Sequence, residues 1–164
     1  MIIPAQEVFL PTFFPQPEHG KCILVVEDDT FVRSATCELL RWVEFEILEA
    51  GNTAAARDIF GCNPARIDVV FCDITLPDGS GVELCRKLSR ESPDLRVVLT
   101  SGYPLATPNQ AFEAETASYF LKKPYSVKTL LAAFHKAFAK RFPSNELLLP
   151  DLIPYSLQNL PGEL

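Results

Sequence analysis

Charged and hydroxyl side chains stand at the ends of four apolar runs in this sequence. They are the acids Glu27, Asp28 and Asp73, the hydroxyl residue Thr100 and the lysine Lys123. Carboxylates that lie close together must share a cation or a proton. A cluster of oxygen ligands without histidine or cysteine suits Mg²⁺ or Mn²⁺. Carboxylates, a divalent ion, a hydroxyl and a lysine together predict phosphoryl chemistry, provided that the fold brings them to one place.

Short apolar runs and amphipathic stretches alternate through the middle of the chain. Strands are predicted at 22–26, 45–50, 67–73, 96–101 and 119–122. Helices are predicted at 31–43, from residue 53 to near residue 61, at 82–91, weakly at 109–117, and at 127–138. The segment ITLPDGSG, which follows Cys72 and Asp73, is predicted to be a loop because of its proline and glycines.

The helix starts and the inward faces of the helices follow from local patterns. The expected N-caps are Thr30, then Asn52 or Thr53, and Ser126. The residues expected to face the core are Phe31, Ala35 and Leu39 in the first helix, Val82, Cys85 and Leu88 in the third, and Val127, Leu130, Leu131, Phe134, Ala137 and Phe138 in the last.

Five strand–helix repeats of this kind predict a parallel sheet with helices on both faces. Right-handed crossovers favour a flavodoxin-like (βα)5 doubly wound sheet with strand order 2-1-3-4-5. In such a sheet the first and third strands are neighbours, about 4.8 Å apart. Sites lie beyond the carboxyl ends of the strands, and the five residues named first all fall there.

Four motifs in order carry a resemblance to a known family. They are LVVEDD, DVVFCDITLPDGSG, VVLTSG and YFLKKPYS. The segment 21–142 resembles the receiver domain of two-component response regulators, and the motifs are specific because they occur together at the right strand ends. Two parts remain outside the resemblance: a proline-rich arm at 1–20 and a proline-punctuated apolar tail at 143–164.

The resemblance implies a role for each acid. Asp73 would be the phosphoacceptor, whose carboxylate attacks phosphorus to give an acyl phosphate. Asp28 and Asp73 would ligate Mg²⁺ directly, with the backbone carbonyl of Thr75 as a further ligand. Glu27 stands where the family usually has its first acid and would act through a metal-bound water. Asp29 is expected to be a solvated acid or a helix-start residue.

Other positions also correspond to the family pattern. Lys123 would pair with the phosphoryl group, and a cis peptide would precede Pro124. Thr100 would be the switch hydroxyl and Phe120 the switch aromatic, although Phe lacks the hydroxyl of a tyrosine. Glu44 departs from the pattern, because the family commonly has glycine there; if φ is positive, glutamate costs on the order of 1 kcal/mol.

Composition limits the remaining classes of function. The formal net charge of −6 argues against nucleic acid or an anionic membrane as the main partner, and no run is long enough to span a membrane. Five cysteines without CxxC spacing predict buried thiols and a reducing, cytoplasmic compartment. The chain ends too soon after its last predicted helix to hold an output domain, so we expect output by protein contact.

The expected partners are a histidine kinase or a histidine phosphotransfer protein. A downstream protein would bind the face formed by the fourth helix, fifth strand and fifth helix, and a homodimer is compatible with this. The chain would be no enzyme beyond catalysing its own phosphorylation and dephosphorylation. Two alternatives remain: a Mg²⁺-dependent phosphatase, which would need D-x-D where Thr75 stands, and a receiver-like docking module without phosphorylation.

Overall fold

A computed structural model gives the structure of the chain and describes residues 20–102 and 118–138. The strands are β1 (Cys22–Val26), β2 (Glu46–Ala50), β3 (Ile67–Asp73), β4 (Thr75–Leu76), β5 (Gly79–Ser80), β6 (Arg96–Ser101) and β7 (Ser118–Lys122). The helices are α1 (Thr30–Trp42), α2 (Thr53–Cys62), α3 (Gly81–Glu91) and α5 (Val127–Phe138). The predicted helix at 109–117 and both arms lie outside the described residues.

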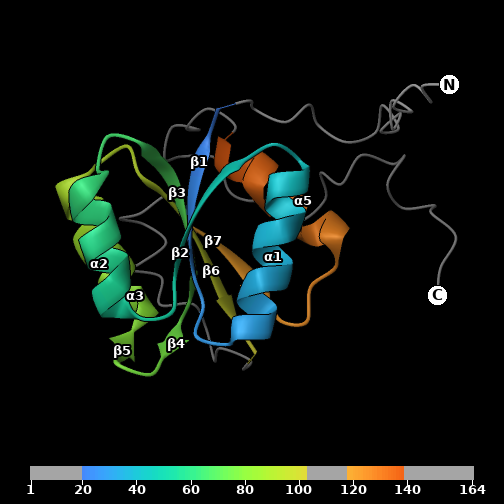
Figure 1. Ribbon diagram of the computed structural model, residues 1–164, viewed down its shortest axis with the longest axis horizontal. Helices are drawn as coiled ribbons and strands as arrows, with labels where there is room; N and C mark the ends of the chain where they lie inside the picture. Colours follow the sequence, from blue (N-terminus) through green and yellow to red (C-terminus); the bar gives the residue numbers. More distant parts are fainter. Residues whose placement is uncertain (1–19, 103–117, 139–164) are drawn as a thin grey trace, which may run out of the picture.

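Five of the strands form one parallel sheet in the order β2-β1-β3-β6-β7. This is the predicted flavodoxin-like order, with β6 and β7 as the fourth and fifth strands of the main sheet. Helices α1 and α5 cover one face of the sheet, and α2 and α3 cover the other (Figure 1). The order confirms that β1 and β3 are neighbours, so residues following them meet at one edge.

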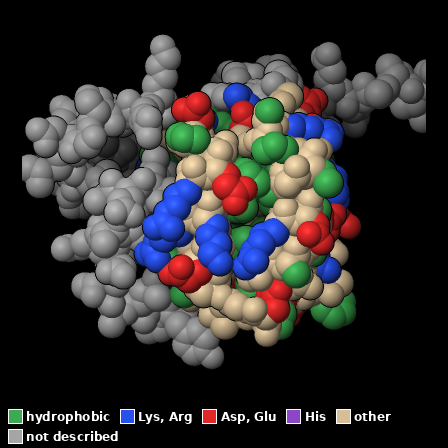
Figure 2. All heavy atoms as spheres, turned by 90° about the vertical axis from the view of Figure 1, so that its left-hand side faces the viewer, with side chains coloured by type: hydrophobic (Ala, Val, Ile, Leu, Met, Phe, Trp, Pro, Cys, Tyr) green, Lys and Arg blue, Asp and Glu red, His purple; other side chains and the backbone are tan. Residues whose placement is uncertain are grey.

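The central strands are buried on both faces, which explains their unbroken apolar runs. In β1, Leu24 and Val26 pack in the cluster under α2 and α3, whereas Ile23 and Val25 pack in the cluster under α1 and α5. All four are 0% exposed. The outer side of α2 and α3 is polar by contrast, and Figure 2 shows lysine, arginine and acidic side chains spread over it.

Helix α1 differs from the prediction in its cap and its inward face. Asp29, not Thr30, is the N-cap, and its Oδ1 accepts hydrogen bonds from the backbone N–H groups of Phe31 and Val32 at 2.9 and 3.1 Å. Phe31 is 88% exposed, whereas Cys37 and Leu40 are buried.

The inward side of α1 includes the polar residues Arg33 and Thr36, so a search for apolar residues alone could not find it. The side chain of Arg33, which is partly buried, reaches back to the end of β1, and Thr36, Cys37 and Leu40 are the buried residues of the helix. Ala35 is exposed, whereas Leu39 is partly buried and packs against the cluster under α1 and α5. The predicted inward residues were therefore wrong at Phe31 and Ala35 and confirmed at Leu39.

The other helices follow the predictions more closely. Asn52 is the N-cap of α2, and the Oγ of Ser126 accepts a hydrogen bond from Thr129 N–H at 3.2 Å at the start of α5. The predicted inward residues of α3 and α5 are buried or partly buried, with one exception. Val127, the first residue of α5, is 48% exposed, because the buried stripe begins one turn later at Leu130.

The predicted loop after β3 contains a small antiparallel pair. Thr75 of β4 pairs with Ser80 of β5, and Leu76 pairs with Gly79, which leaves a two-residue turn at 77–78. Leu76 is 7% exposed and packs in the cluster under α2 and α3. Strands of two residues are too short to give an alternating pattern, so the sequence could not indicate them.

Two further expectations concern single residues. Glu44, between α1 and β2, has a φ of 67°, so the condition under which glutamate carries a conformational cost at this position is met. Four cysteines are buried as expected, but Cys62 at the end of α2 is exposed, and all five are free thiols. None of the helices in the described ranges has the length and apolar character needed to cross a membrane.

Candidate functional site

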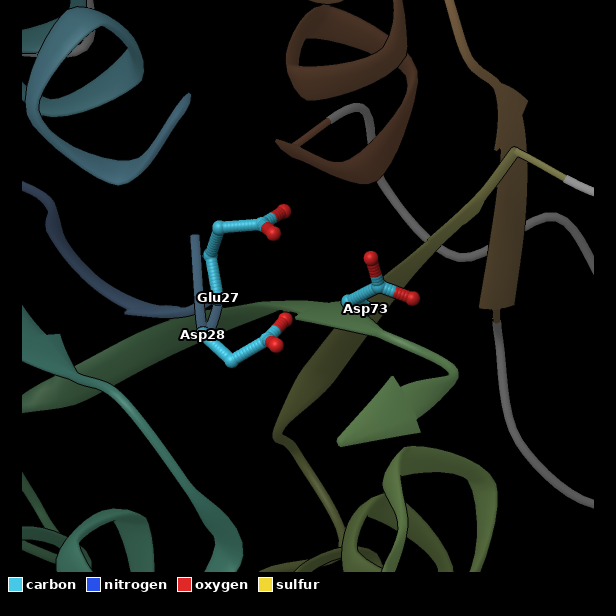
Figure 3. A group of neighbouring side chains, drawn as sticks. All are labelled: Glu27, Asp28 and Asp73. Carbon is cyan, nitrogen blue, oxygen red and sulfur yellow. The ribbon is translucent and has the colours of Figure 1, made fainter. Parts of the chain in front are cut away.

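Three carboxylates converge beyond the carboxyl ends of β1 and β3. Glu27 and Asp28 directly follow β1, and Asp73 is the last residue of β3. Each of the three offers a carboxylate oxygen within 4.8 Å of the others. Figure 3 shows the side chains of Glu27 and Asp28 extending toward Asp73. Glu27 and Asp73 are buried, whereas Asp28 is exposed, so the cluster opens to solvent on one side.

Lys123 supplies the positive charge that this cluster needs. It follows β7, and its backbone N–H donates to the carbonyl of Ser101 at 2.8 Å. Its Nζ donates to Glu27 Oε2 at 2.6 Å and to Asp73 Oδ2 at 2.5 Å. The peptide between Lys123 and Pro124 is cis, as expected. The lysine predicted for this site thus bridges two of the three predicted acids.

Burial and charge act against each other in this group. Burial raises the pKa of Glu27 above its usual value, although Lys123 partly opposes that effect through its hydrogen bond and its charge. Burial also lowers the pKa of Lys123, but hydrogen bonds from its ammonium to Asp73 and Glu27 outweigh the burial, so the net shift is upward. The lysine therefore stays charged, and its charge opposes the upward effect of burial on the pKa of Glu27.

Thr100 presents a buried hydroxyl without a hydrogen-bond partner among the described residues. Thr100 of β6 lies opposite Asp73 of β3 and is 0% exposed, and its Oγ1 is unsatisfied. Buried hydroxyls nearly always have a partner, so an unsatisfied one beside an acidic cluster fits a group that binds there.

The backbone around Asp73 is held tightly. Thr75 N–H donates to Asp73 Oδ1 at 2.9 Å. A Cβ added at Gly81, the first residue of α3, would lie 1.9 Å from the carbonyl oxygen of Asp73 and 2.8 Å from Cys72 Sγ. Only glycine, which has no Cβ, fits where the start of α3 contacts the backbone of Asp73. No local pattern could have shown this, because the contact depends on how α3 packs against β3.

Arg33 is a second residue of the site that the sequence analysis missed. Its Nη1 donates to the backbone carbonyl of Glu27 at 2.6 Å and to that of Asp28 at 3.3 Å. Its Nε lies 3.8 Å from Glu49 Oε2. The available signal was an arginine one turn into the helix that follows the acids. Its effect is to fix the backbone that carries two of the carboxylates.

Phe120, the predicted switch aromatic, lies in β7, three residues before Lys123. Phe120 is partly buried and packs against the cluster under α2 and α3, while Tyr119 packs on the other face of the sheet. Lys122 is exposed. The roles of Phe120 as a switch aromatic and of the Thr75 carbonyl as a ligand stay predictions.

The family model of the response regulator receiver domain matches residues 23–135. The match covers more than half of the chain and includes every residue of the acidic cluster. The chain therefore belongs to the response regulator receiver domain family. This confirms the class of function expected from the motifs, that of a phosphoaccepting receiver in two-component signalling.

Individual relatives agree with this assignment. The sensor kinase CckA of Brucella abortus is 28% identical over 119 residues, which are 73% of this chain and 13% of the kinase. A solved receiver domain from the hybrid histidine kinase CckA is 33% identical, covers 71% of this chain and 97% of that one, and superposes with a TM-score of 0.62. TrrA of Thermotoga maritima, solved in complex with Mg²⁺ and BeF, is 25% identical over 71% of this chain and 98% of that one, with a TM-score of 0.63.

Proposed function

We propose that the chain accepts a phosphoryl group on Asp73 from a histidine kinase or a histidine phosphotransfer protein. The proposal is carried by the ion pairs that the Nζ of Lys123 forms with both Glu27 and Asp73. Asp28 is the third carboxylate of the same cluster. A structural ion pair would need one acid for one lysine. Three convergent carboxylates around one lysine leave an excess of negative charge, which suits a divalent cation.

Mg²⁺ or Mn²⁺ is the proposed cofactor, held by Asp28 and Asp73 directly, by Glu27 through water and by the carbonyl of Thr75. The donors fit a hard cation because all are oxygens, and their carboxylates lie close enough together to share one ion. Bound there, the ion would neutralise charge on the phosphoryl oxygens. TrrA, with its Mg²⁺ and BeF, gives the comparison that supports this choice of cofactor.

In the proposed reaction, a carboxylate oxygen of Asp73 forms a bond to phosphorus as the phosphorus–nitrogen bond of the donor's phosphohistidine breaks. The electron pair of that bond goes to the imidazole nitrogen. Lys123 exchanges its contact with Asp73 for one with a phosphoryl oxygen. Thr100 Oγ1 donates to another phosphoryl oxygen, and Phe120 is the proposed switch aromatic. The catalysis is thus positioning and charge stabilisation of the chain's own modification.

The proposed output is a change in the face that β7 and α5 form together with the helix expected at 109–117. A downstream protein would bind this face in the phosphorylated state. The chain would catalyse only its own phosphorylation and dephosphorylation. A reducing, cytoplasmic compartment fits its five free thiols.

The test is Mg²⁺-dependent phosphorylation by acetyl phosphate or phosphoramidate, read by intact mass. The wild-type protein should gain one phosphoryl group when Mg²⁺ is present and none when EDTA is added before the phosphodonor. Asp73→Asn removes the nucleophile and should stay unmodified, whereas Asp94→Asn, an exposed acid before β6, should react like wild type. Equal modification of the Asp73 variant would refute the assignment.

A further inference from the structure

The β4–β5 pair connects the acidic site to the start of α2 through one side chain. Asp78 lies in the two-residue turn of this pair, and its carboxylate points to α2. Asp78 Oδ1 accepts a hydrogen bond from Thr53 N–H at 2.8 Å. Asp78 Oδ2 accepts one from Thr53 Oγ1 at 2.9 Å and one from Ala54 N–H at 3.0 Å. Three bonds therefore join segments 25 residues apart.

This carboxylate completes the N-terminus of α2. The first four N–H groups of a helix lack partners within the helix. Asn52, the local cap, accepts from Ala55 N–H through Oδ1 at 2.8 Å, while its carbonyl accepts the first helical i→i−4 bond, from Ala56 N–H, at 3.1 Å. Asp78 accepts from the N–H groups of Thr53 and Ala54. The bond from Thr53 N–H is the main cause of a lowered pKa of Asp78, as expected for a carboxylate at a helix N-terminus.

The other end of the β4–β5 pair is fixed to the phosphoacceptor. Thr75, the first residue of β4, donates its N–H to Asp73 Oδ1. Gly81 N–H, just after β5, donates to the carbonyl of Ile74 at 3.0 Å. β5 also lies beside α2, since a Cβ at Gly79 would lie 3.6 Å from Thr53 Cγ2. The segment from Ile74 to Ser80 is thus held at Asp73 on one side and at α2 on the other.

We propose that Asp78 is a positioning residue of the acidic site: by fixing the β4–β5 pair to α2 it sets the position of the Thr75 backbone, and so the affinity of the site for a divalent cation. The inference rests on the proposed function, because it takes Thr75 as part of the cation site. Asp78 itself touches neither the acids nor the phosphoryl group. Its action passes through the turn and β4.

The test compares cation binding in Asp78→Ala and wild type, with Mg²⁺ measured by calorimetry and Mn²⁺ by electron paramagnetic resonance. Loss of a residue that orients a ligand typically weakens metal affinity at least tenfold, so we expect a Kd raised about tenfold. The rate of phosphorylation by phosphoramidate should fall at low Mg²⁺ and recover at saturating Mg²⁺. Partial unfolding alone would lower the number of sites and leave the Kd unchanged.

Two control variants separate positioning from stability and from charge. Asn52→Ala removes a cap bond from the same helix without touching the β4–β5 pair, so it should lower the thermal midpoint but keep the Kd of wild type. Asp78→Asn loses the charge but keeps an oxygen that can accept from Thr53 N–H. Its Kd should lie between those of wild type and Asp78→Ala. Equal Kd values for the Asn and Ala variants would mean that only the charge matters, and would overturn the proposal.

A third readout uses the reciprocity of coupled equilibria. If Asp78 couples α2 to the cation site, Mg²⁺ must stabilise the Asp78 contacts by the same free energy by which those contacts favour Mg²⁺. Amide exchange at Thr53 and Ala54 should therefore slow about tenfold at saturating Mg²⁺ in wild type, and not in Asp78→Ala. If wild type binds Mg²⁺ and Asp78→Ala binds it equally well, this inference fails alone. If wild type binds no divalent cation, the proposed function fails and the inference with it.

Discussion

The two strands that carry the acidic site hold their carboxylates in different ways. On the β1 side, a single long side chain fixes the backbone, because the guanidinium of Arg33 donates hydrogen bonds to the carbonyls of Glu27 and Asp28. On the β3 side, the backbone of Asp73 lies directly against Gly81 with no room for a methyl group. A flexible side chain can adjust by tenths of an ångström, whereas two packed backbones cannot. The β3 side should therefore tolerate change far less well.

Gly81→Ala should break the β3 side and have the largest effect. The new methyl group would lie 1.9 Å from the carbonyl of Asp73, so α3 or β3 must shift. We expect the free energy of unfolding to fall by about 3 kcal/mol. Urea unfolding measures it. Gly79→Ala is the matched control, because its Cβ would meet Thr53 Cγ2 at an ordinary 3.6 Å. If both variants lose the same stability, the close approach at Gly81 is not what matters.

Arg33→Met should break the β1 side with a smaller effect. The variant keeps much of the aliphatic packing but leaves the carbonyls of Glu27 and Asp28 without their donor. We expect a loss of about 1 to 2 kcal/mol in urea unfolding, typical of a hydrogen bond from a charged group. Arg41→Met also removes an arginine partner of Glu49, but at the surface, and should cost less than about 1 kcal/mol. A loss at Arg33 larger than that at Gly81 would reverse the comparison.

Thr100→Val, on the strand next to β3, should stabilise the protein, whereas the two preceding variants destabilise it. The hydroxyl of Thr100 is buried without a partner in the described structure, so its removal should raise the stability of the unphosphorylated protein by up to about 1 kcal/mol. Thr36→Val is the control, because Thr36 Oγ1 has the hydroxyl of Tyr125 at 3.3 Å and its loss should destabilise by about 1 kcal/mol. Thermal melts in the presence and absence of beryllofluoride should also show a smaller stabilising shift in Thr100→Val than in wild type. A destabilised Thr100→Val would mean that the hydroxyl already has a partner.

Glu44→Gly changes the connection between α1 and β2, away from the acidic cluster, and should have the smallest effect on stability. Glu44 has a φ of 67°, which glycine adopts without steric cost, although glycine also loses more chain entropy on folding. The net result should be a gain of a few tenths of a kcal/mol, seen as a small rise in the urea midpoint. Glu44→Ala keeps the Cβ and should give no such gain. Equal behaviour of the two variants would locate the effect in the glutamate carboxylate instead of the backbone.

The parts of this molecule that the sequence could predict are those with a local or periodic cause. The runs at β1, β3 and β6 are apolar throughout because both faces are covered, and parallel strands bring their carboxyl ends to one edge. That rule alone placed Glu27, Asp28, Asp73 and Lys123 together. It could not show that Lys123 bridges two of the acids, since that depends on side-chain geometry.

The misses share a different physical cause, which is contact between segments remote in the chain. The inward face of α1 was misjudged because Arg33 points to the end of β1, a contact that hydrophobic periodicity ignores. Gly81 is required by the packing of α3 on β3. Asp78 caps a helix that begins 25 residues earlier. Each of these depends on tertiary structure and leaves no periodic trace in the sequence.

The shared cap of α2 also has a consequence for the order in which the chain folds. Two of the first N–H groups of α2, those of Thr53 and Ala54, find their acceptor in Asp78 within the described part of the chain. The helix therefore cannot reach its native end state until β3 and the turn at 77–78 have been added. A ten-residue helix is marginal by itself in water. As the chain leaves the ribosome, α2 should therefore fray until residue 78 emerges, and then form together with β3 and the β4–β5 turn as one cooperative unit.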